Sequence, residues 1–128
     1  MIVLDTHALL WWTQQPGLLS DTSSTAIDSA DRILVPSICF WEVALLVQRG
    51  RFALRRGQPV LEWANDILSI PRVAAVSLTP ELALSADALD MHPDPADRFI
   101  AATALSRQAP LVTKDDALRA LPWLRTVW

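Results

Sequence analysis

The chain opens with Met1-Ile2-Val3-Leu4-Asp5, four apolar residues that end at a carboxylate. Comparable runs follow at residues 33–35, 73–76 and 111–113, and residues 126–127 form a shorter fifth. None of these runs alternates apolar with polar residues, so each predicts a short strand that is covered on both faces. The opening run therefore predicts one strand of a parallel sheet, with helices on both sides of it.

The segments between these runs have helical patterns. We expect helices over residues 6–14, 20–30, 37–48, 59–70, 79–89 and 94–108, and a short one that starts at Asp115 or Asp116. Ser37 is the expected N-cap of the third helix, and Pro59 suits the first position of the fourth. The β-α-β alternation predicts an α/β fold, a three-layer α/β/α sandwich with a short, mainly parallel sheet and right-handed crossovers.

Length and composition limit the class of protein. A chain of 128 residues predicts one domain that spans residues 1–128. The formal net charge of −3 excludes a uniformly cationic coat for nucleic acid. Hydrophobic residues make up 52%, which excludes disorder and is high for a small domain. Part of the apolar surface is therefore expected to contact a partner.

The sequence also predicts a cytoplasmic protein. Cys39 is the only cysteine, so an intramolecular disulfide framework is excluded and a reducing compartment is favoured. The first residues have no basic segment and no small-residue cleavage site. The longest apolar stretch, residues 38–47, is interrupted by Glu42 and is too short for a membrane span.

Two acids follow strands that lie far apart in the sequence. Asp5 ends the first expected strand, and Asp115 follows the strand at 111–113 by two residues. Sites in doubly wound sheets form outside the carboxyl ends of the strands, so both acids are expected at one edge of the sheet. Either acid alone is also accounted for as the N-cap of the next helix.

Glu42 is the only charged residue in an apolar helix. The positions around it on every face are apolar, and such a helix is expected to be buried. A carboxylate inside it needs a metal ion or a charged partner, because a stranded buried charge is costly. A buried ion pair with an arginine is the alternative to a metal site.

Asp97 lies three residues beyond Asp94 in a predicted helix start. With Asp94 as N-cap and Pro95 at the first position, Asp97 occupies the third, where an acid complements the helix dipole. Asp97 also shares a face with Ile100, which directs it inward. Asp94 instead lies four residues before Arg98, a spacing typical of a surface ion pair. We therefore assign Asp97 to a site and Asp94 to a cap.

These four acids, Asp5, Glu42, Asp97 and Asp115, form a set of hard oxygen ligands with no cysteine or repeated histidine among them. Such ligands suit Mg²⁺ or Mn²⁺ rather than zinc. A divalent ion relieves the repulsion among clustered carboxylates, and it can activate water for the hydrolysis of a phosphodiester. The set therefore predicts a catalytic metal site.

Four segments resemble, in the right order, the motifs of PIN-domain ribonucleases, and in particular of the VapC-like toxins of type II toxin–antitoxin pairs. They are residues 2–11 (IVLDTHALLW), 37–43 (SICFWEV), 94–104 (DPADRFIAATA) and 111–115 (LVTKD). Each motif alone is weak, but together they cover essentially the whole chain. The opening DTHALLWW is similar to one branch of that family.

The resemblance implies a PIN-like fold and a Mg²⁺- or Mn²⁺-dependent endoribonuclease whose metal-binding and catalytic residues are the same four acids. Thr113 matches the family's hydroxyl position before the last acid, and Thr6 is a supporting candidate of the same kind. Asp116 is an alternative to Asp115, although the Thr-x-Asp spacing favours Asp115.

The resemblance also implies partners. The substrate would be RNA, cut to leave a 3′-hydroxyl and a 5′-phosphate. A cognate antitoxin protein would mask the site, and the toxin would form a homodimer and a dimer of heterodimers with it. No membrane partner is implied.

A basic strip follows the third expected helix. Phe52 and Leu54 are interspersed with four arginines: Arg49, Arg51, Arg55 and Arg56. One interpretation is a solvated helix end, where arginine complements the helix dipole. The other is a contact for RNA phosphates or for an acidic segment of an antitoxin.

The chain has six tryptophans, a high count. We expect Trp11, Trp12 and Trp41 to be core or interface anchors rather than platforms for base stacking. His7 is expected to pack at a helix start, because carboxylate–metal sites need no imidazole. His92 is expected in a loop.

Two other classes of protein remain alternatives. A phosphoaspartate phosphatase or receiver-like domain would use Asp5 as its nucleophile, but residue 7 is a histidine where such phosphatases place a second acid. A non-catalytic module that binds RNA or protein would account for the basic strip and the apolar excess.

Overall fold

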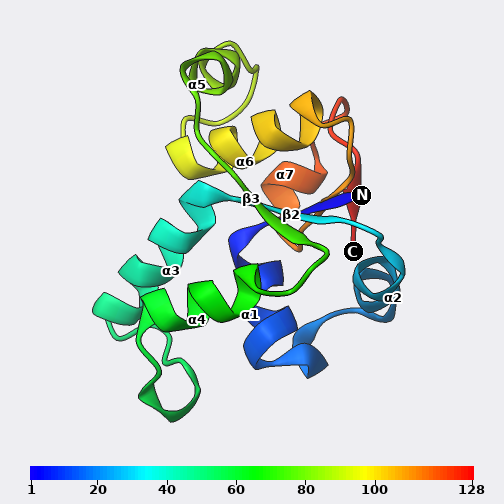
Figure 1. Cartoon of the computed structure of the whole chain (residues 1–128). Coiled ribbons are helices and arrows are strands. Elements are labelled where there is room, and N and C mark those ends of the chain that lie inside the picture. The colour runs from blue at the N-terminus through cyan, green and yellow to red at the C-terminus, as the bar shows by residue number, and fades with distance from the viewer.

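A five-stranded sheet forms the centre of the computed structural model, which describes all 128 residues (Figure 1). The order across the sheet is β3-β2-β1-β4-β5, and every neighbouring pair is parallel. This confirms the predicted α/β class and the parallel sheet. The strands are β1 (Ile2–Leu4), β2 (Ile33–Pro36), β3 (Val73–Val76), β4 (Leu111–Val112) and β5 (Thr126–Val127).

Seven α-helices connect the strands, as the sequence predicted. They are α1 (Thr6–Gln14), α2 (Asp21–Ser29), α3 (Ser37–Gln48), α4 (Val60–Leu68), α5 (Pro80–Asp87), α6 (Pro95–Ser106) and α7 (Asp116–Arg119). Two short 3₁₀ turns that the sequence did not reveal lie at Pro16–Leu18 and Arg55–Gly57. None of the helices has the length and apolar character that crossing a membrane requires.

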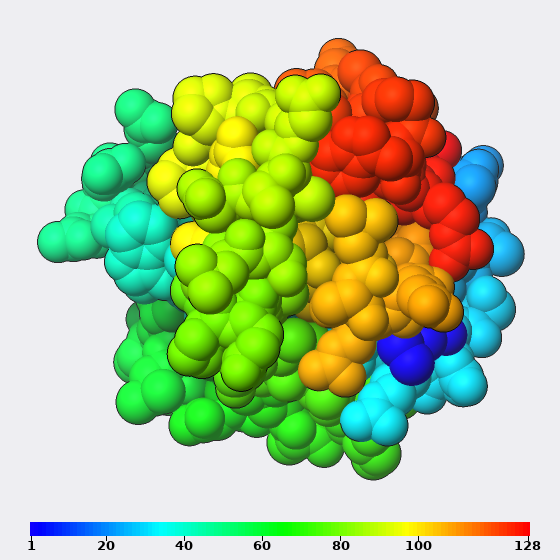
Figure 2. All heavy atoms as spheres, turned by 90° about the horizontal axis from the view of Figure 1, so that it is seen from above, coloured from blue at the N-terminus to red at the C-terminus, as the bar shows by residue number.

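The helices form one layer on each face of the sheet. The chain moves outward from β1 to β3 with α1 to α4, then crosses to β4 with α5 and α6, so the two sets of helices take opposite faces. In Figure 1, α6 and α7 lie above the sheet and α1, α2 and α4 lie below it. Figure 2 looks down on the upper face, where α5 is outermost beside α6.

The core is built on β1 and α6. All three residues of β1 are buried, as expected of the middle strand of a covered sheet. The inner face of α6 carries small side chains, including Ala101 and Ala104, that bring the helix close to β1 and β2. Ile100 fills the space between them and is 1% exposed. This packing fixes the start of α6 next to the carboxyl end of β1.

Most predicted elements begin or end one or two residues from the observed bounds, and three of the differences concern a proline or a cap. The second strand was predicted over residues 33–35, but it extends to Pro36. Pro36 pairs with Val76 of β3 and lies beyond the two residues of β2 that pair with β1, where its missing N–H is not needed. The N-cap of α3 is Pro36 rather than Ser37, which is the first helical residue and caps nothing. Pro59 is the N-cap of α4, one position before the predicted place.

The prediction that α3 is buried on all sides was also wrong. Only Cys39 and Val43 are buried, and the Trp41 side chain is 56% exposed. The reason is geometric: α3 leaves the end of β2 and is covered only where α1, α4 and α6 contact it. Ile38, Phe40, Leu46 and Val47 are partly buried against the core, whereas Trp41 faces outward on the chain by itself. The prediction that Cys39 is a packed thiol is confirmed.

Candidate functional site

The order of the strands reverses between β1 and β4, and the candidate site lies at their carboxyl ends. Strand β1 leads outward to β2, whereas β4 leads the other way to β5, so the loops after β1 and β4 diverge. A crevice at such a point is the usual place for a site in a doubly wound sheet. Asp5 follows β1, and Thr113 and Asp115 follow β4.

Asp5 is both a helix cap and a buried acid of the site. One carboxylate oxygen accepts a hydrogen bond of 2.7 Å from the backbone N–H of Ala8, and the other accepts one from the Thr113 hydroxyl. The side chain is fixed and only 6% exposed. Burial raises the pKa of Asp5 above its usual range, and the negative charge of Asp97 adds to this. The cap predicted for Asp5 is confirmed, and Asp5 lies at the expected edge of the sheet; its role in a metal site stays a prediction.

Glu42 projects from α3 toward the same place. Its carboxylate accepts a hydrogen bond from the Thr6 hydroxyl at the start of α1. The three ion pairs of the chain do not include it, so the alternative of a buried ion pair with arginine was wrong. Burial raises the pKa of Glu42, and the nearby negative charges of Asp97 and Asp94 raise it further. Glu42 is thus a partly buried carboxylate without a cation.

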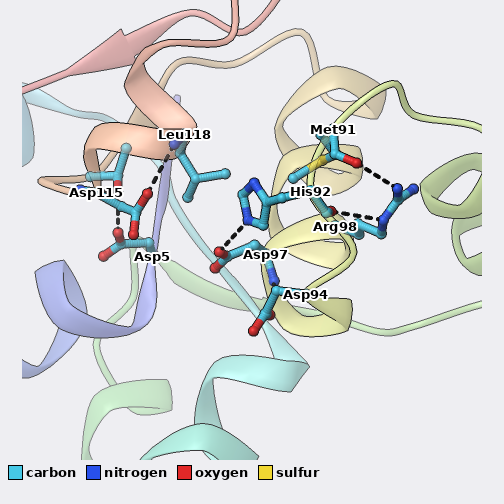
Figure 3. A network of polar contacts seen from close by, with 9 residues as sticks. Asp5, Met91, His92, Asp94, Asp97, Arg98, Asp115 and Leu118 are labelled. Atoms are coloured by element: carbon cyan, nitrogen blue, oxygen red, sulfur yellow. Dashed lines mark hydrogen bonds and ion pairs between the residues drawn. The ribbon is translucent and has the colours of Figure 1, made fainter.

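Asp97 lies at the third position of α6, as predicted. The Asp94 side chain caps the helix by accepting a 3.1 Å hydrogen bond from the Asp97 N–H. Burial raises the pKa of Asp97, and so do the charges of Asp94 and Asp115, while the contact with His92 opposes the shift. In Figure 3 the Asp97 side chain leaves the start of α6, and its carboxylate points toward Asp5 and Asp115.

Asp115 and its neighbour Asp116 point to different places. Asp115 is the N-cap of α7 and accepts a 2.9 Å hydrogen bond from the Leu118 N–H. Its own N–H donates to the Thr113 hydroxyl at 3.0 Å, so Thr113 connects Asp115 with Asp5. The Asp116 side chain is 98% exposed and faces Arg119 at 3.7 Å. This geometry favours Asp115 over Asp116 as the fourth acid.

The four acids interact electrostatically through Asp97. The charge of Asp97 raises the pKa of Asp5 and of Glu42, and the charge of Asp115 raises the pKa of Asp97. No three His, Cys, Asp or Glu side chains are arranged closely enough to hold a metal ion as they stand. The structure thus brings the predicted acids into one electrostatic cluster but not into a set of converging ligands.

His92 and Arg98 are the two residues of this region whose roles sequence analysis missed. His92 lies in a loop, as predicted, but its Nε2 is 2.8 Å from the Asp97 carboxylate (Figure 3). The predicted surface pair of Asp94 with Arg98 is absent, because the Arg98 guanidinium donates instead to the carbonyl oxygens of Ala86, Asp87, Leu89, Met91 and His92. Arg98 therefore joins the end of α5 to the loop that carries His92.

The basic strip follows the C-terminal end of α3, which is the end away from β2 (Figure 1). Arg55 is occupied in the fold: its Nε donates to the Gln14 carbonyl at 3.0 Å, and its backbone N–H donates to the Gln14 side chain. Arg49 is the C-cap of α3, where a cation complements the helix dipole. Arg51 and Arg56 are exposed. The strip is thus in part structural, and it is separate from the acids.

Comparisons with known proteins agree with this architecture. The profile of the PIN domain family matches residues 2–124. Ribonuclease VapC22 of Mycobacterium tuberculosis is 40% identical over 131 aligned positions, which cover 99% of this chain and 98% of that protein. The chain therefore belongs to the PIN-domain family, in its VapC branch.

Two solved structures share the fold at low sequence identity. One is VapBC2 from Rickettsia felis bound to a DNA fragment from its promoter, with a TM-score of 0.70, 18% identity, and coverage of 98% of this chain and 97% of that one. The other is a toxin–antitoxin complex from Klebsiella pneumoniae, with a TM-score of 0.65, 15% identity, and coverage of 95% and 93%. At these identities the likeness concerns the fold.

Proposed function

We propose that the protein is a divalent-metal-dependent endoribonuclease and the toxin of a type II toxin–antitoxin pair. The observation that carries the proposal is the cluster of Asp5, Glu42, Asp97 and Asp115 at the point where the strand order reverses. Ribonucleic acid as the substrate is supported by the 40% identity to a protein named Ribonuclease VapC22.

The donor chemistry of the cluster fits Mg²⁺ or Mn²⁺. All four side chains offer carboxylate oxygens, which hard divalent ions prefer. The raised pKa values of Asp5, Glu42 and Asp97 reflect burial and mutual repulsion. A cation would offset both the cost of burying the charged carboxylates and the repulsion between them. Glu42 and Asp97 would exchange their present contacts with Thr6 and His92 for the ion, because the side chains do not converge as they stand.

Each residue of the cluster would then have a distinct task. Asp5, Glu42 and Asp97 would hold the ion, and Asp115 would hold a second ion or orient the attacking water. Thr113 fixes Asp5 and the start of α7 together, so the acids from β1 and β4 keep their relative position. An ion held there would supply Lewis acidity, which would activate water for attack on phosphorus and offset the charge of the phosphate. The products would be a 3′-hydroxyl and a 5′-phosphate.

A cognate antitoxin and a second copy of the chain are the proposed protein partners. Two structural neighbours are VapBC2 from Rickettsia felis and a toxin–antitoxin complex from Klebsiella pneumoniae. The exposed apolar side of α3, with Trp41 at its centre, is the surface of this chain that such a partner would cover. A dimer of heterodimers would result. The exposed arginines Arg49, Arg51 and Arg56 would contact RNA or an acidic antitoxin segment, with Arg55 supporting their loop.

Cleavage of total cellular RNA by the purified protein tests the proposal. We expect discrete fragments with Mg²⁺ or Mn²⁺, none with chelator, and none with Asp5→Asn. Asn is a good N-cap and can accept the Ala8 hydrogen bond, so this variant should keep its fold, which circular dichroism checks. Fragments that persist in the chelator or with folded Asp5→Asn would contradict the assignment. Tight RNA binding by folded, metal-loaded protein without cleavage would favour the non-catalytic module.

A further inference from the structure

A hollow with an aromatic wall and a lysine lies directly beside the acids. Its volume is about 330 Å³, and it is lined by Asp5, His7, Trp11, Lys114 and Asp115. It opens at the carboxyl ends of β1 and β4, between the starts of α1 and α7. A space of this size matches a single small ligand rather than a flat protein surface. Two of the proposed catalytic acids thus share a hollow with groups that the proposed reaction has not used.

The wall of the hollow is a cluster of rings around Trp11. The His7 ring lies one helical turn away with its centroid 5.6 Å from the Trp11 ring, and the Trp128 ring, which does not line the hollow, has its centroid 5.5 Å from the Trp11 ring. The interplanar angles are 52° and 58°, so neither ring lies flat against the indole. Trp11 is half-buried and His7 is exposed. Such rings, held by the fold and open to solvent, provide a surface on which a base can stack.

Lys114 supplies the cation of the hollow. It is the only lysine of the chain, and it follows β4 directly after Thr113. Its Nζ lies 5.7 Å from the centre of the Trp11 ring. The side chain is exposed and belongs to none of the three ion pairs, although Asp5 and Asp115 line the same hollow. Apart from its cation–π contact with Trp11, its charge is unpaired and available for a phosphate.

We propose that this hollow is a subsite for one nucleotide of single-stranded RNA next to the scissile phosphate. The base stacks on the Trp11 ring, with the tilted His7 ring against its edge, and Lys114 contacts the phosphate that follows it. The inference rests on the proposed ribonuclease function, and it reverses the expectation that Trp11 is only a packing anchor. Paired bases are stacked within a helix and unavailable to the rings, so the subsite selects unpaired segments.

Binding of a short, fluorescein-labelled, single-stranded RNA of mixed sequence tests the subsite. The parent protein is Asp5→Asn with Mg²⁺ present, so that the RNA stays intact, and anisotropy gives the Kd at several salt concentrations. Trp11→Leu, which keeps an apolar side chain but no ring, should raise the Kd by about 10-fold. Trp11→Phe should restore most of the affinity, because it restores a stacking surface.

Lys114→Ala tests the phosphate contact. It should raise the Kd and reduce the slope of log affinity against log salt by about 0.7, the value for one phosphate contact with a single strand. Arg107→Ala removes an exposed cation at the end of α6, outside the hollow, and is the matched control whose slope should stay unchanged. A duplex of the same sequence should bind without any dependence on Trp11.

Several results would overturn the subsite. The first is a parent protein that binds no single-stranded RNA. The second is a Trp11→Leu variant with the parent's Kd. The third is a loss of affinity with Lys114→Ala but not with Trp11→Leu, because a site for an acidic peptide would give the same result. Cleavage of cellular RNA by the wild-type protein separates the two proposals. If RNA is cut while binding ignores Trp11, the subsite fails alone. If RNA stays intact while binding depends on Trp11, the nuclease proposal fails, and the hollow remains as a binding site for single-stranded RNA without a scissile phosphate.

Discussion

Helices α3 and α6 both have 12 residues and each brings one acid to the site, yet their surroundings differ. Helix α6 buries Ile100 and most of its alanines against the sheet. Helix α3 is more apolar but buries only Cys39 and Val43, and it leaves Trp41 exposed. Apolar sequence alone therefore does not place a helix in the core of this protein. The position of α6 is fixed within the chain, whereas that of α3 leaves surface for a partner.

The largest expected effect concerns the acids that the two helices carry, Asp97 in α6 and Glu42 in α3. Asp97→Asn should lower kcat for RNA cleavage by about 10³-fold, within the range for loss of a catalytic carboxylate. Glu42→Gln should lower kcat less, by about 10²-fold. Of the other three acids, only Asp97 affects the pKa of Glu42, and the Gln side chain can keep the contact with Thr6. Initial rates on one mapped RNA substrate measure both. Equal losses would mean that the two helices contribute equally, and a smaller loss for Asp97→Asn would reverse their ranking.

The second test compares packing in the two helices. Ile100→Ala in α6 should lower the free energy of unfolding by about 2–5 kcal/mol, because a fully buried side chain leaves a cavity. Leu45→Ala in α3 should cost less than about 1 kcal/mol in the isolated chain, since Leu45 is only partly buried. Urea denaturation gives both values. A Leu45→Ala cost as large as that of Ile100→Ala would show that α3 is already covered in solution, as a homodimer would do.

The third test concerns Arg98, which ties α6 to the preceding loop. Arg98→Ala should cost about 1.5–3 kcal/mol of unfolding free energy, because the carbonyl oxygens that it contacts lose a charged donor. Arg98→Lys should recover only part, since an ammonium group lacks the planar fork of donors. Thermal melts of both variants against Arg107→Ala, at the other end of α6, measure the effect. An Arg98→Ala melt identical to wild type would exclude this role.

The smallest effect is a pH dependence of stability in metal-free buffer. Burial raises the pKa of Asp5 in the folded state, so the native chain binds more protons than the unfolded chain above the ordinary pKa of 3.8. The contribution of Asp5 to stability is present below that pH and is lost as pH rises through the raised pKa. The Tm of Asp5→Asn should therefore equal that of wild type in acid and exceed it at neutral pH. A difference that shrinks with rising pH would contradict this sign.

Much of the fold could be predicted because its strands are short, unbroken apolar runs with clear ends. Asp5, Asp97 and Asp115 could also be placed from the sequence, since each follows a strand or a helix cap by a fixed number of residues. The exposure of α3 could not, because hydropathy does not tell whether the chain itself or a partner covers an apolar helix.

The contacts that support the site depend on loops, and periodicity carries no information about them. His92 reaches Asp97 because Arg98 holds the loop between α5 and α6 by its carbonyl oxygens. The sequence contains one signal for this contact: Pro93 and Pro95 stiffen the segment between His92 and Asp97. Similarly, Lys114 and Trp11 lie far apart in the sequence and meet only because β1 and β4 are neighbours.

The central claim is that the acids at the β1 and β4 ends hydrolyse RNA with activated water, and the chemistry of the fragment ends tests it most directly. Wild-type protein with Mg²⁺ or Mn²⁺ should give fragments with 5′-phosphate and 3′-hydroxyl ends at discrete positions, and Asp5→Asn should give none. Fragments ending in a 2′,3′-cyclic phosphate would contradict the claim, because they arise from attack by the ribose 2′-hydroxyl and need no water.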